Sequence, residues 1–516
     1  MRRSGSIVGG IVGVVALFAA SCDGCNHKGG SDGGGGSGGG AAVADLSVAP
    51  GACNTDPDCK NPGELCCSFV CVQTSSCALA VTQVVPAGGF QNGGEYITLH
   101  GAGFVAGMKV FIEKGRAPLH VIDAATARIQ APPGPVGMQD LSIVVGGAQA
   151  TLHQGYSYRS AGLETAWEQK PLTKVRGEDP GLAVLQDGRV LVAGGTTVPD
   201  YATMAVATAE IYTRASDTVA LAANSMSTPR WQNSAVTLLT GKVLVVGGAC
   251  AIGGTCNGDT QAADLFDPAT NLFAPTANKL NKPRYYTRAV LMVDGRVFIS
   301  SANDPSIEIY DPATDGFTLV AHTQLHQYGF VVRLRDGRIL LGGGDATSAA
   351  ELYDGDANTF TPTSSPMTSS RAMLTAHTLP DGRVFAIGGA NMSAGAIIDP
   401  TATIDIFDPV NGSFTSAPFT LGTTRSWHAS ALVRDGTILV MGGYTVHNMC
   451  NSSVATVETI DPVAAKVTAF ANLPNTNTEW TAVTLLDGSV LGVGGGACGT
   501  TMALPDIDFL AGAPIP

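Results

Sequence analysis

The chain has 516 residues, too many for one ordinary domain, so several modules are expected. Only 14% of the residues are charged, whereas 65 are glycine and 28 are proline, and this excess of helix breakers favours an all-β protein. The net charge is −13 without a basic cluster, which argues against nucleic-acid binding, because phosphate contacts need Lys and Arg. Twelve cysteines fit an oxidising compartment.

Residues 1–21 are typical of an export signal: Arg2 and Arg3 precede an apolar stretch that is short for a membrane span. Small residues just before Cys22 resemble the lipobox of bacterial lipoproteins. This resemblance implies that Cys22 becomes the acylated first residue of the mature protein. Ordinary cleavage nearby, leaving Cys22 for a disulfide, is the alternative. Residues 22–52 then form a Gly/Ser-rich tether.

Residues 53–77 form a cysteine-rich module. So short a segment buries too little apolar surface to fold alone, so disulfides are expected to replace a core. The candidates are Cys53, Cys59, Cys66, Cys67, Cys71 and Cys77. The adjacent pair resembles small knottin and whey-acidic-protein-like modules, although the spacing leaves the pairing open. A zinc site is the weaker alternative, because no histidine lies nearby.

Residues 78–159 predict a small β-sandwich from short alternating runs between glycine and proline turns. The runs are residues 96–99, 109–112, 127–130 and 141–145. The segment resembles the immunoglobulin-like IPT/TIG family at Pro86, Gly88, Gly89, Gly93, Gly94, Gly101, Gly103, Phe104, Gly107, Pro132, Pro133, Gly137 and residues 155–158. That family is common in receptors and surface proteins, and a spacer role is expected here.

One stretch recurs seven times within residues 160–516. Its first copy, Asp-Gly-Arg-Val-Leu-Val-Ala-Gly-Gly, spans residues 187–195, and successive copies lie 42 to 54 residues apart. The others begin at Thr240, Asp294, Asp336, Asp381, Asp435 and Asp487. Each copy reads as a hairpin turn, an apolar strand and a diglycine. A strand-rich repeat of this length predicts a propeller or a solenoid.

A typical unit, residues 229–275, predicts four antiparallel strands, as in one propeller blade. The diglycine followed by a Glu-x-Tyr-Asp-Pro-like strand resembles the kelch repeat family in all seven units. The resemblance implies a seven-bladed kelch β-propeller over residues 160–516. The third unit departs from the pattern with Ser300 and Ser301 at the diglycine, a change that we expect a regular blade to tolerate.

The seventh unit ends without a fourth strand. Residues 165–172 precede the first unit and read like the missing strand. We expect them to complete the last blade and so to join the two ends of the ring, because a closed ring leaves no unpaired edge.

A polar residue starts each unit, ten residues before the hairpin turn or eleven in the first unit: Arg176, Arg230, Arg284, His326, Arg371, Arg425 and Asn477. Aromatic residues follow several of them, and Arg beside aromatics at a central mouth can bind an acidic glycan, a sugar ring or a protein loop. The candidate ligand-binding residues are Arg230, Trp231, Arg284, Arg371, Arg425, Trp427, His428 and Trp480. The alternative, favoured for any individual arginine, is a framework role in bonding carbonyls.

The loops after the diglycines are long in five contiguous units of the ring and should raise one side of this face, where function tends to sit. Four cysteines lie in these loops. Cys250 and Cys256 are expected to pair within one loop, and Cys450 with Cys498 between neighbouring blades.

The repeats also resemble those of copper radical oxidases of the galactose-oxidase type, which implies a copper site built from two Tyr and two His. The matching Tyr-His pair is Trp427-His428 here, and Trp supplies no phenolate. The remaining histidines, including His322, His326, His377 and His447, form no convincing ligand set. We therefore expect no catalytic residue, no metal and no cofactor.

The sequence thus favours a non-enzymatic protein, lipid-anchored to the bacterial cell envelope at the outer membrane or cell surface. Its expected partner is an extracellular glycan or protein held by the propeller, with membrane contact through the anchor alone and no nucleic acid. The alternatives are a copper-radical-oxidase-like enzyme and a structural envelope scaffold.

Overall fold

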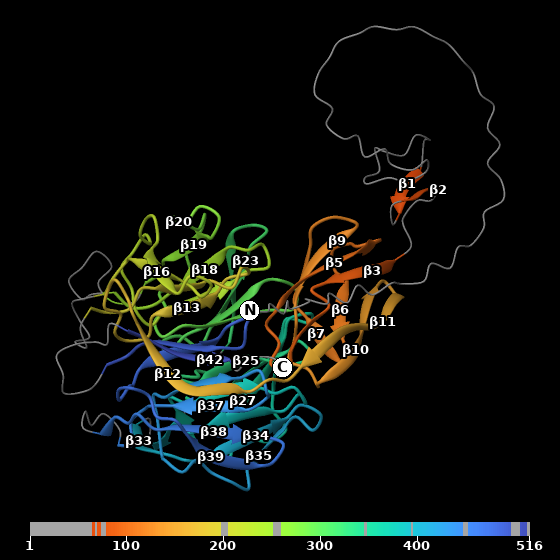
Figure 1. Ribbon diagram of the computed structural model, residues 1–516. Coiled ribbons are helices and arrows are strands. Elements are labelled where there is room, and N and C mark those ends of the chain that lie inside the picture. Colours follow the sequence, from red (N-terminus) through yellow and green to blue (C-terminus); the bar gives the residue numbers. More distant parts are fainter. Residues whose placement is uncertain are drawn as a thin grey trace, which may run out of the picture. The chain divides into compact units, whose positions relative to one another are not determined.

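The computed structural model describes residues 64–67, 70–73, 79–197, 205–250, 258, 260–322, 324–344, 348–393, 396–446, 452–496 and 506–512. Every named element in this part of the chain is a strand, so the expected all-β class is confirmed (Figure 1). None of the described segments is a helix long and apolar enough to cross a membrane. The export signal, Cys22 and the tether lie outside the described residues.

A two-stranded hairpin comes first, formed by β1 (Glu64–Cys67) and β2 (Val70–Gln73). In its register Cys66 lies opposite Cys71. The disulfides of the cysteine-rich module stay a prediction, because Cys53, Cys59 and Cys77 lie outside the described residues.

The next segment is a β-sandwich, as the alternating runs predicted. One sheet has the order β4-β11-β10-β6-β7 and the other β3-β5-β9-β8. The strands are β3 (Ala80–Val85), β4 (Gly88–Phe90), β5 (Tyr96–Ala102), β6 (Lys109–Ile112), β7 (Gly115–Ala117), β8 (Leu119–Val121), β9 (Thr126–Gln130), β10 (Gly137–Val145) and β11 (Ala148–Arg159). Between the sheets lies a core that includes Ile97, Leu99, Val110, Ile129 and Ile143, each fully buried.

Seven four-stranded antiparallel sheets follow, which we number as blades 1 to 7. Blade 1 has β13 (Gly181–Val184), β14 (Val190–Ala193), β15 (Ala209–Thr213) and β16 (Thr218–Leu221). Blade 2 has β17 (Ser234–Thr237), β18 (Val243–Val246), β19 (Ala263–Asp267) and β20 (Leu272–Pro275). Blade 3 has β21 (Arg288–Leu291), β22 (Val297–Ser300), β23 (Ile307–Asp311) and β24 (Gly316–Val320). Blade 4 has β25 (Phe330–Arg333), β26 (Ile339–Gly342), β27 (Ala350–Asp354) and β28 (Thr359–Pro362).

Blade 5 has β30 (Thr375–Thr378), β31 (Val384–Ile387), β34 (Ile404–Asp408) and β35 (Ser413–Ser416). A small extra sheet beside it joins β29 (Arg371–Ala372), β32 (Ala390–Ser393) and β33 (Ala396–Pro400). Blade 6 has β36 (Ala429–Leu432), β37 (Ile438–Met441), β38 (Val457–Asp461) and β39 (Lys466–Phe470). Blade 7 has β40 (Trp480–Thr484), β41 (Val490–Gly494), β42 (Asp506–Gly512) and β12 (Leu163–Pro171).

The first strand of each blade lines the centre of a ring. These inner strands contact one another in a closed cycle of β13, β17, β21, β25, β30, β36 and β40, back to β13. The second strand of each blade is buried on both faces, as its continuous apolar sequence requires. The diglycines permit close approach between blades: a Cβ at Gly194 would lie 2.3 Å from the carbonyl oxygen of Arg230 in the next blade.

Blade 7 closes the ring with both ends of the propeller segment. Strand β12 pairs antiparallel with β42, with Trp167 opposite Leu510 and Lys170 opposite Ile507. The Trp167 indole also donates a hydrogen bond to the Ala471 carbonyl, 2.8 Å away. The expected origin of the missing strand is therefore confirmed.

The sandwich contacts the propeller at the hairpin turns of blades 3 and 4. The Arg116 amide donates to the Arg335 carbonyl (2.6 Å), and the Leu119 amide donates to the Val293 carbonyl (3.1 Å). The Arg116 guanidinium also makes a two-pronged contact of 2.8 and 3.0 Å with the Asp356 carboxylate. The segment thus packs against one end of the propeller, and it leaves the opposite end of the inner strands uncovered by these contacts.

Removing β12 should expose the edge of β42 and break the ring closure. A fragment that begins at residue 173 should therefore melt at a clearly lower temperature than one that begins at residue 160, because unpaired backbone groups replace a full ladder. Calorimetry of the two fragments measures this. Equal melting temperatures would contradict the closure role.

Candidate functional site

Each blade except 4 and 7 contains a fully buried arginine paired with a buried carboxylate. The pairs with their separations are Arg176–Glu210 (2.8 Å), Arg284–Glu308 (2.9 Å), Arg371–Asp405 (2.9 Å) and Arg425–Glu458 (2.6 Å), and Arg230 pairs with Asp264 in the same way. All five arginines are 0% exposed. A charge so far from solvent is tolerated only when it is paired and hydrogen-bonded.

Further hydrogen bonds tie these arginines to the blade. Nη1 of Arg176, Arg371 and Arg425 donates to the carbonyl of the first glycine of the diglycine, at 2.8, 3.0 and 2.7 Å. In blade 3, Ser301 takes the place of the first glycine, and its hydroxyl accepts from Arg284 at 3.1 Å. These contacts place Arg230, Arg284, Arg371 and Arg425 in the framework, the alternative that the sequence favoured.

Blades 4 and 7 use other residues at this position. His326 bonds the Gly343 carbonyl through Nδ1 (2.9 Å), and His322 bonds Glu351 through Nε2 (2.6 Å). Burial opposes ionisation of Glu351, but the two imidazoles outweigh it and lower the pKa of that carboxyl to about 2. In blade 7 the Asn477 amide donates to the Gly494 carbonyl at 3.3 Å.

Just after each of these positions, one residue per blade has a left-handed backbone: Asp179, Gln232, Tyr286, Tyr328, Met373, Trp427 and Glu479, with φ from 37° to 57°. We call this set the left-handed ring. Backbone hydrogen bonds join its members: the Asp179 amide donates to the Glu479 carbonyl (3.1 Å), and the Trp427 amide to the Met373 carbonyl (3.2 Å). Such a conformation costs a non-glycine residue about 1 kcal/mol, and strain of this kind collects at functional sites.

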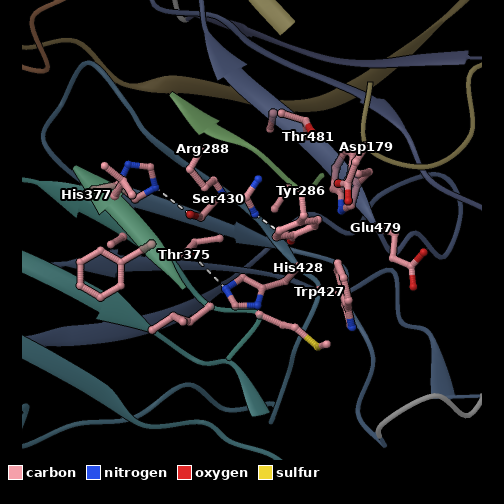
Figure 2. A pocket seen from close by; sticks show the side chains of 18 residues that line it. Asp179, Tyr286, Arg288, Thr375, His377, Trp427, His428, Ser430, Glu479 and Thr481 are labelled. Carbon is pink, nitrogen blue, oxygen red and sulfur yellow. Dashed lines mark hydrogen bonds between the residues drawn. The ribbon is translucent and has the colours of Figure 1, made fainter. Parts of the chain in front are cut away.

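The ring surrounds a pocket of about 230 Å³ where the inner strands begin, which we call the mouth pocket (Figure 2). Its polar and aromatic lining includes Asp179, Tyr286, Arg288, Thr375, His377, Trp427, His428, Ser430, Glu479 and Trp480. Figure 2 shows Asp179 and Glu479 at one end of the pocket and His377 at the other. The pocket therefore draws its side chains from several blades.

Two carboxyl groups from neighbouring blades lie at one end of the pocket. Burial raises the pKa of Asp179 to about 6, with Arg288 acting against the shift. Burial, followed by repulsion from Asp179, raises the pKa of Glu479 to about 8. Among the described residues neither carboxylate has an ion-pair partner, and Asp179 Oδ2 is buried without a hydrogen bond. This end of the pocket therefore holds an acceptor, Asp179 Oδ2, that the described part of the chain leaves unused.

Three aromatic rings adjoin the carboxyls. The centroid of Tyr286 lies 4.8 Å from that of Tyr328 and 5.4 Å from that of Trp427, each pair edge to face. The Arg288 guanidinium lies over the Tyr286 ring, 4.2 Å from its centroid, and donates to the Tyr286 hydroxyl at 2.7 Å. The indole nitrogen of Trp427 is buried and has no hydrogen-bond partner among the described residues.

The imidazoles of the pocket are neutral at physiological pH. Burial lowers the pKa of His377 to about 4, and burial with nearby Arg425 lowers that of His428 to about 3. His377 bonds the Ser430 hydroxyl at 2.7 Å, and His428 bonds the Thr375 hydroxyl at 3.0 Å. No group of three or more His, Cys, Asp or Glu in the described segments is arranged to hold a metal ion. With Trp427 in place of a phenol beside His428, these residues do not fit the copper site of a radical oxidase.

The structure therefore brings together three of the eight candidate residues: Trp427, His428 and Trp480 line the mouth pocket. Trp231 lies outside its lining, and its backbone bridges to Ala249. Sequence reasoning missed Asp179, Arg288 and Glu479. The signal that could have found the two acids is their place two or three residues after the repeated blade-start residue.

The expected disulfides of the loops are only partly visible. Cys250 is disulfide-bonded, and its expected partner Cys256 lies outside the described residues. Cys450 and Cys498 lie outside them as well.

Comparisons with known proteins agree with this architecture. Residues 79–159 match the IPT/TIG domain family. The propeller resembles two kelch-repeat proteins of Limulus polyphemus: beta-scruin is 28% identical over 211 residues, and alpha-scruin is 24% identical over 195. These matches cover 38% and 34% of this chain but only 22% and 21% of the scruins, so the chain spans about a fifth of their length. The expected combination of an IPT/TIG domain with a kelch-like propeller is confirmed.

A fungal alcohol oxidase of the AA5 family, solved in complex with copper, is similar in structure. Its TM-score is 0.53 at 17% identity, and the match covers 67% of this chain and 76% of the oxidase. At that identity the likeness describes the fold alone.

The buried pairs predict a large loss of stability when one partner is removed. Glu308→Ala leaves the Arg284 charge buried without its carboxylate and should lower the free energy of unfolding by about 3–5 kcal/mol. Glu168→Ala, which breaks a contact with Lys170 where the carboxylate is half exposed, should cost less than about 1 kcal/mol. Urea denaturation compares them, and losses of equal size would refute the framework role.

The raised pKa of Glu479 predicts that Glu479→Gln stabilises the folded protein by an amount that depends on pH. Because the folded pKa of about 8 exceeds the ordinary value of 4.5, the protonated carboxyl contributes stability below that value, and this contribution is lost as the pH rises to 8. The variant should therefore become more stable than the wild type with rising pH, by on the order of 5 kcal/mol at pH 9, since each pH unit between the two pKa values contributes about 1.4 kcal/mol. Urea unfolding at several pH values tests this, with the exposed Glu164→Gln as control; a difference independent of pH would count against it.

Proposed function

We propose that the chain is a non-enzymatic binding protein of the cell envelope that holds a partner protein at the mouth pocket. The observation that carries this proposal is the set of unused polar atoms in the pocket. Asp179 Oδ2, Trp427 Nε1 and His428 Nδ1 are buried without a hydrogen bond to any described residue, and such groups call for a bound partner or ordered water. Similarity to the kelch-repeat scruins supports a protein partner.

The N-terminal sequence supports attachment to a membrane. Positive residues, a short apolar stretch and small residues before Cys22 favour export followed by acylation of that cysteine. The Gly/Ser-rich residues 29–40 then lift the folded domains away from the bilayer. The lipid anchor would keep the propeller at the envelope, at the outer membrane or cell surface.

Two alternative functions rank below binding of a partner protein. A carbohydrate can use the same aromatic rings and carboxyls, and it is the second choice because no comparison favours it. A copper-radical-oxidase-like activity is third, since Trp427 supplies no phenolate and the imidazoles are engaged with hydroxyls. Stoichiometric copper binding with turnover of alcohols or sugars would establish the oxidase instead.

Site-specific photocrosslinking in cells tests the proposal. A benzoylphenylalanine at Tyr328, on the left-handed ring, should form an adduct of defined mass with one protein, whereas the same group at Thr361 on the exposed outer strand β28 should not. Cys22→Ser should move the protein out of the membrane fraction. Adducts from both positions, or from neither, would contradict binding at the mouth.

A further inference from the structure

The mouth pocket has a charge imbalance that defines what it can bind. Its two carboxyl groups, Asp179 and Glu479, come from blades 1 and 7, and the only guanidinium among the described residues of its lining belongs to Arg288. The imidazoles His377 and His428 are neutral above pH 5, because burial lowers the pKa of each. When both carboxyls are ionised, the described lining therefore carries one negative charge in excess.

Among the described residues, the guanidinium of the lining is engaged with an aromatic ring. Arg288 is turned toward Tyr286, with its guanidinium over the ring and a hydrogen bond to the hydroxyl. Neither Asp179 nor Glu479 takes part in an ion pair within the described residues, and Asp179 is 9% exposed with Oδ2 unpartnered. A buried carboxylate without a partner is costly, so a cation that enters the pocket gains more than it would at the surface.

The aromatic rings favour the same kind of ligand. Tyr286, Tyr328 and Trp427 lie within 5.6 Å of one another by centroid. Faces of Tyr and Trp attract guanidinium and ammonium groups, and the Arg288–Tyr286 contact is an example inside this pocket. Figure 2 shows Trp427 on the same side of Tyr286 as the two carboxyls.

We infer that the mouth pocket binds a single positively charged side chain of a partner protein, an arginine or a lysine, between Trp427 and the carboxyls of Asp179 and Glu479. The inference rests on the proposed function and names the group that the partner presents. The cation replaces the missing ion pair, stacks on the indole and balances the excess charge of the pocket. The strained backbone of the left-handed ring holds these side chains in place before the ligand arrives.

Calorimetric titration of the full chain tests this with N-acetyl-arginine amide and its neutral isostere N-acetyl-citrulline amide. The arginine compound should bind at least about tenfold more tightly, because both have the same shape and only one is charged. Glu479→Gln should weaken arginine binding about tenfold. Gln232→Ala should not, because Gln232 is on the same ring but outside the pocket lining.

The pH dependence of arginine affinity provides a second test, because a purely structural role of Glu479 would not produce it. Affinity in the wild type should rise about tenfold per unit between pH 6 and 8 as Glu479 ionises, and the rise should be lost in Glu479→Gln. Asp179 has largely ionised by pH 7, Arg288 stays charged, and both imidazoles stay neutral in this range. Burial raises the pKa of the tyrosines Tyr286 and Tyr328, so they remain neutral as well.

Equal affinity for citrulline and arginine, binding of neutral galactose without arginine binding, or no binding at all would overturn the inference. A small-molecule cation could fill the pocket in place of a protein side chain. The affinity for agmatine, a free guanidinium compound, is therefore compared with the affinity for the tripeptide Ala-Arg-Ala. Tighter binding of agmatine would overturn the protein side chain as ligand. A crosslinked partner that still forms with Glu479→Gln would leave the proposed function standing and remove this inference alone.

Discussion

The buried ion pair within five of the seven blades is the interaction on which the rest of the propeller depends. An arginine just before the inner strand meets a carboxylate on the third strand and a carbonyl at the diglycine, all without access to water. Removing two charges from water is expensive, so the pair persists only where the charges meet each other and further hydrogen bonds support them. The pair therefore fixes the position of the backbone just before the inner strand, because a small displacement would break its hydrogen bonds.

That constraint has a consequence two or three residues later. The backbone is turned left-handed at this position in every blade, and five of the seven residues there line the mouth pocket. The framework residue repeats, whereas the side chain that it positions differs between blades: two acids, three aromatics, an amide and a thioether. A regular scaffold thus presents an irregular set of side chains at one mouth, which is how repeat folds acquire specificity.

Much of this architecture could be predicted from the sequence, because it depends on local periodic signals. The hairpin turns and the diglycines predicted the positions of the blades. Residues 165–172, which precede the first repeat, predicted that β12 completes the last blade. The alternating runs of the IPT/TIG segment gave its strands, but its packing against the hairpin turns of blades 3 and 4 depends on surface contacts that have no periodicity.

The site was predictable only in part. Repetition drew attention to the arginines, which burial then placed in the framework, because a repeated residue serves what the blades share. Asp179, Arg288 and Glu479 occur in single blades, and they become a site only when ring closure brings blades 1, 3 and 7 around one pocket. Their burial and the repulsion between the carboxyls arise only in the closed ring. The sequence of a single repeat therefore cannot predict them.

A crystal structure of the chain with N-acetyl-arginine amide tests the central claim most directly. The account predicts the guanidinium beside the Trp427 indole, within hydrogen-bond distance of the Asp179 and Glu479 carboxylates, with the framework arginines unmoved. An empty mouth pocket with the compound bound elsewhere, or a guanidinium that avoids both carboxylates, would contradict it.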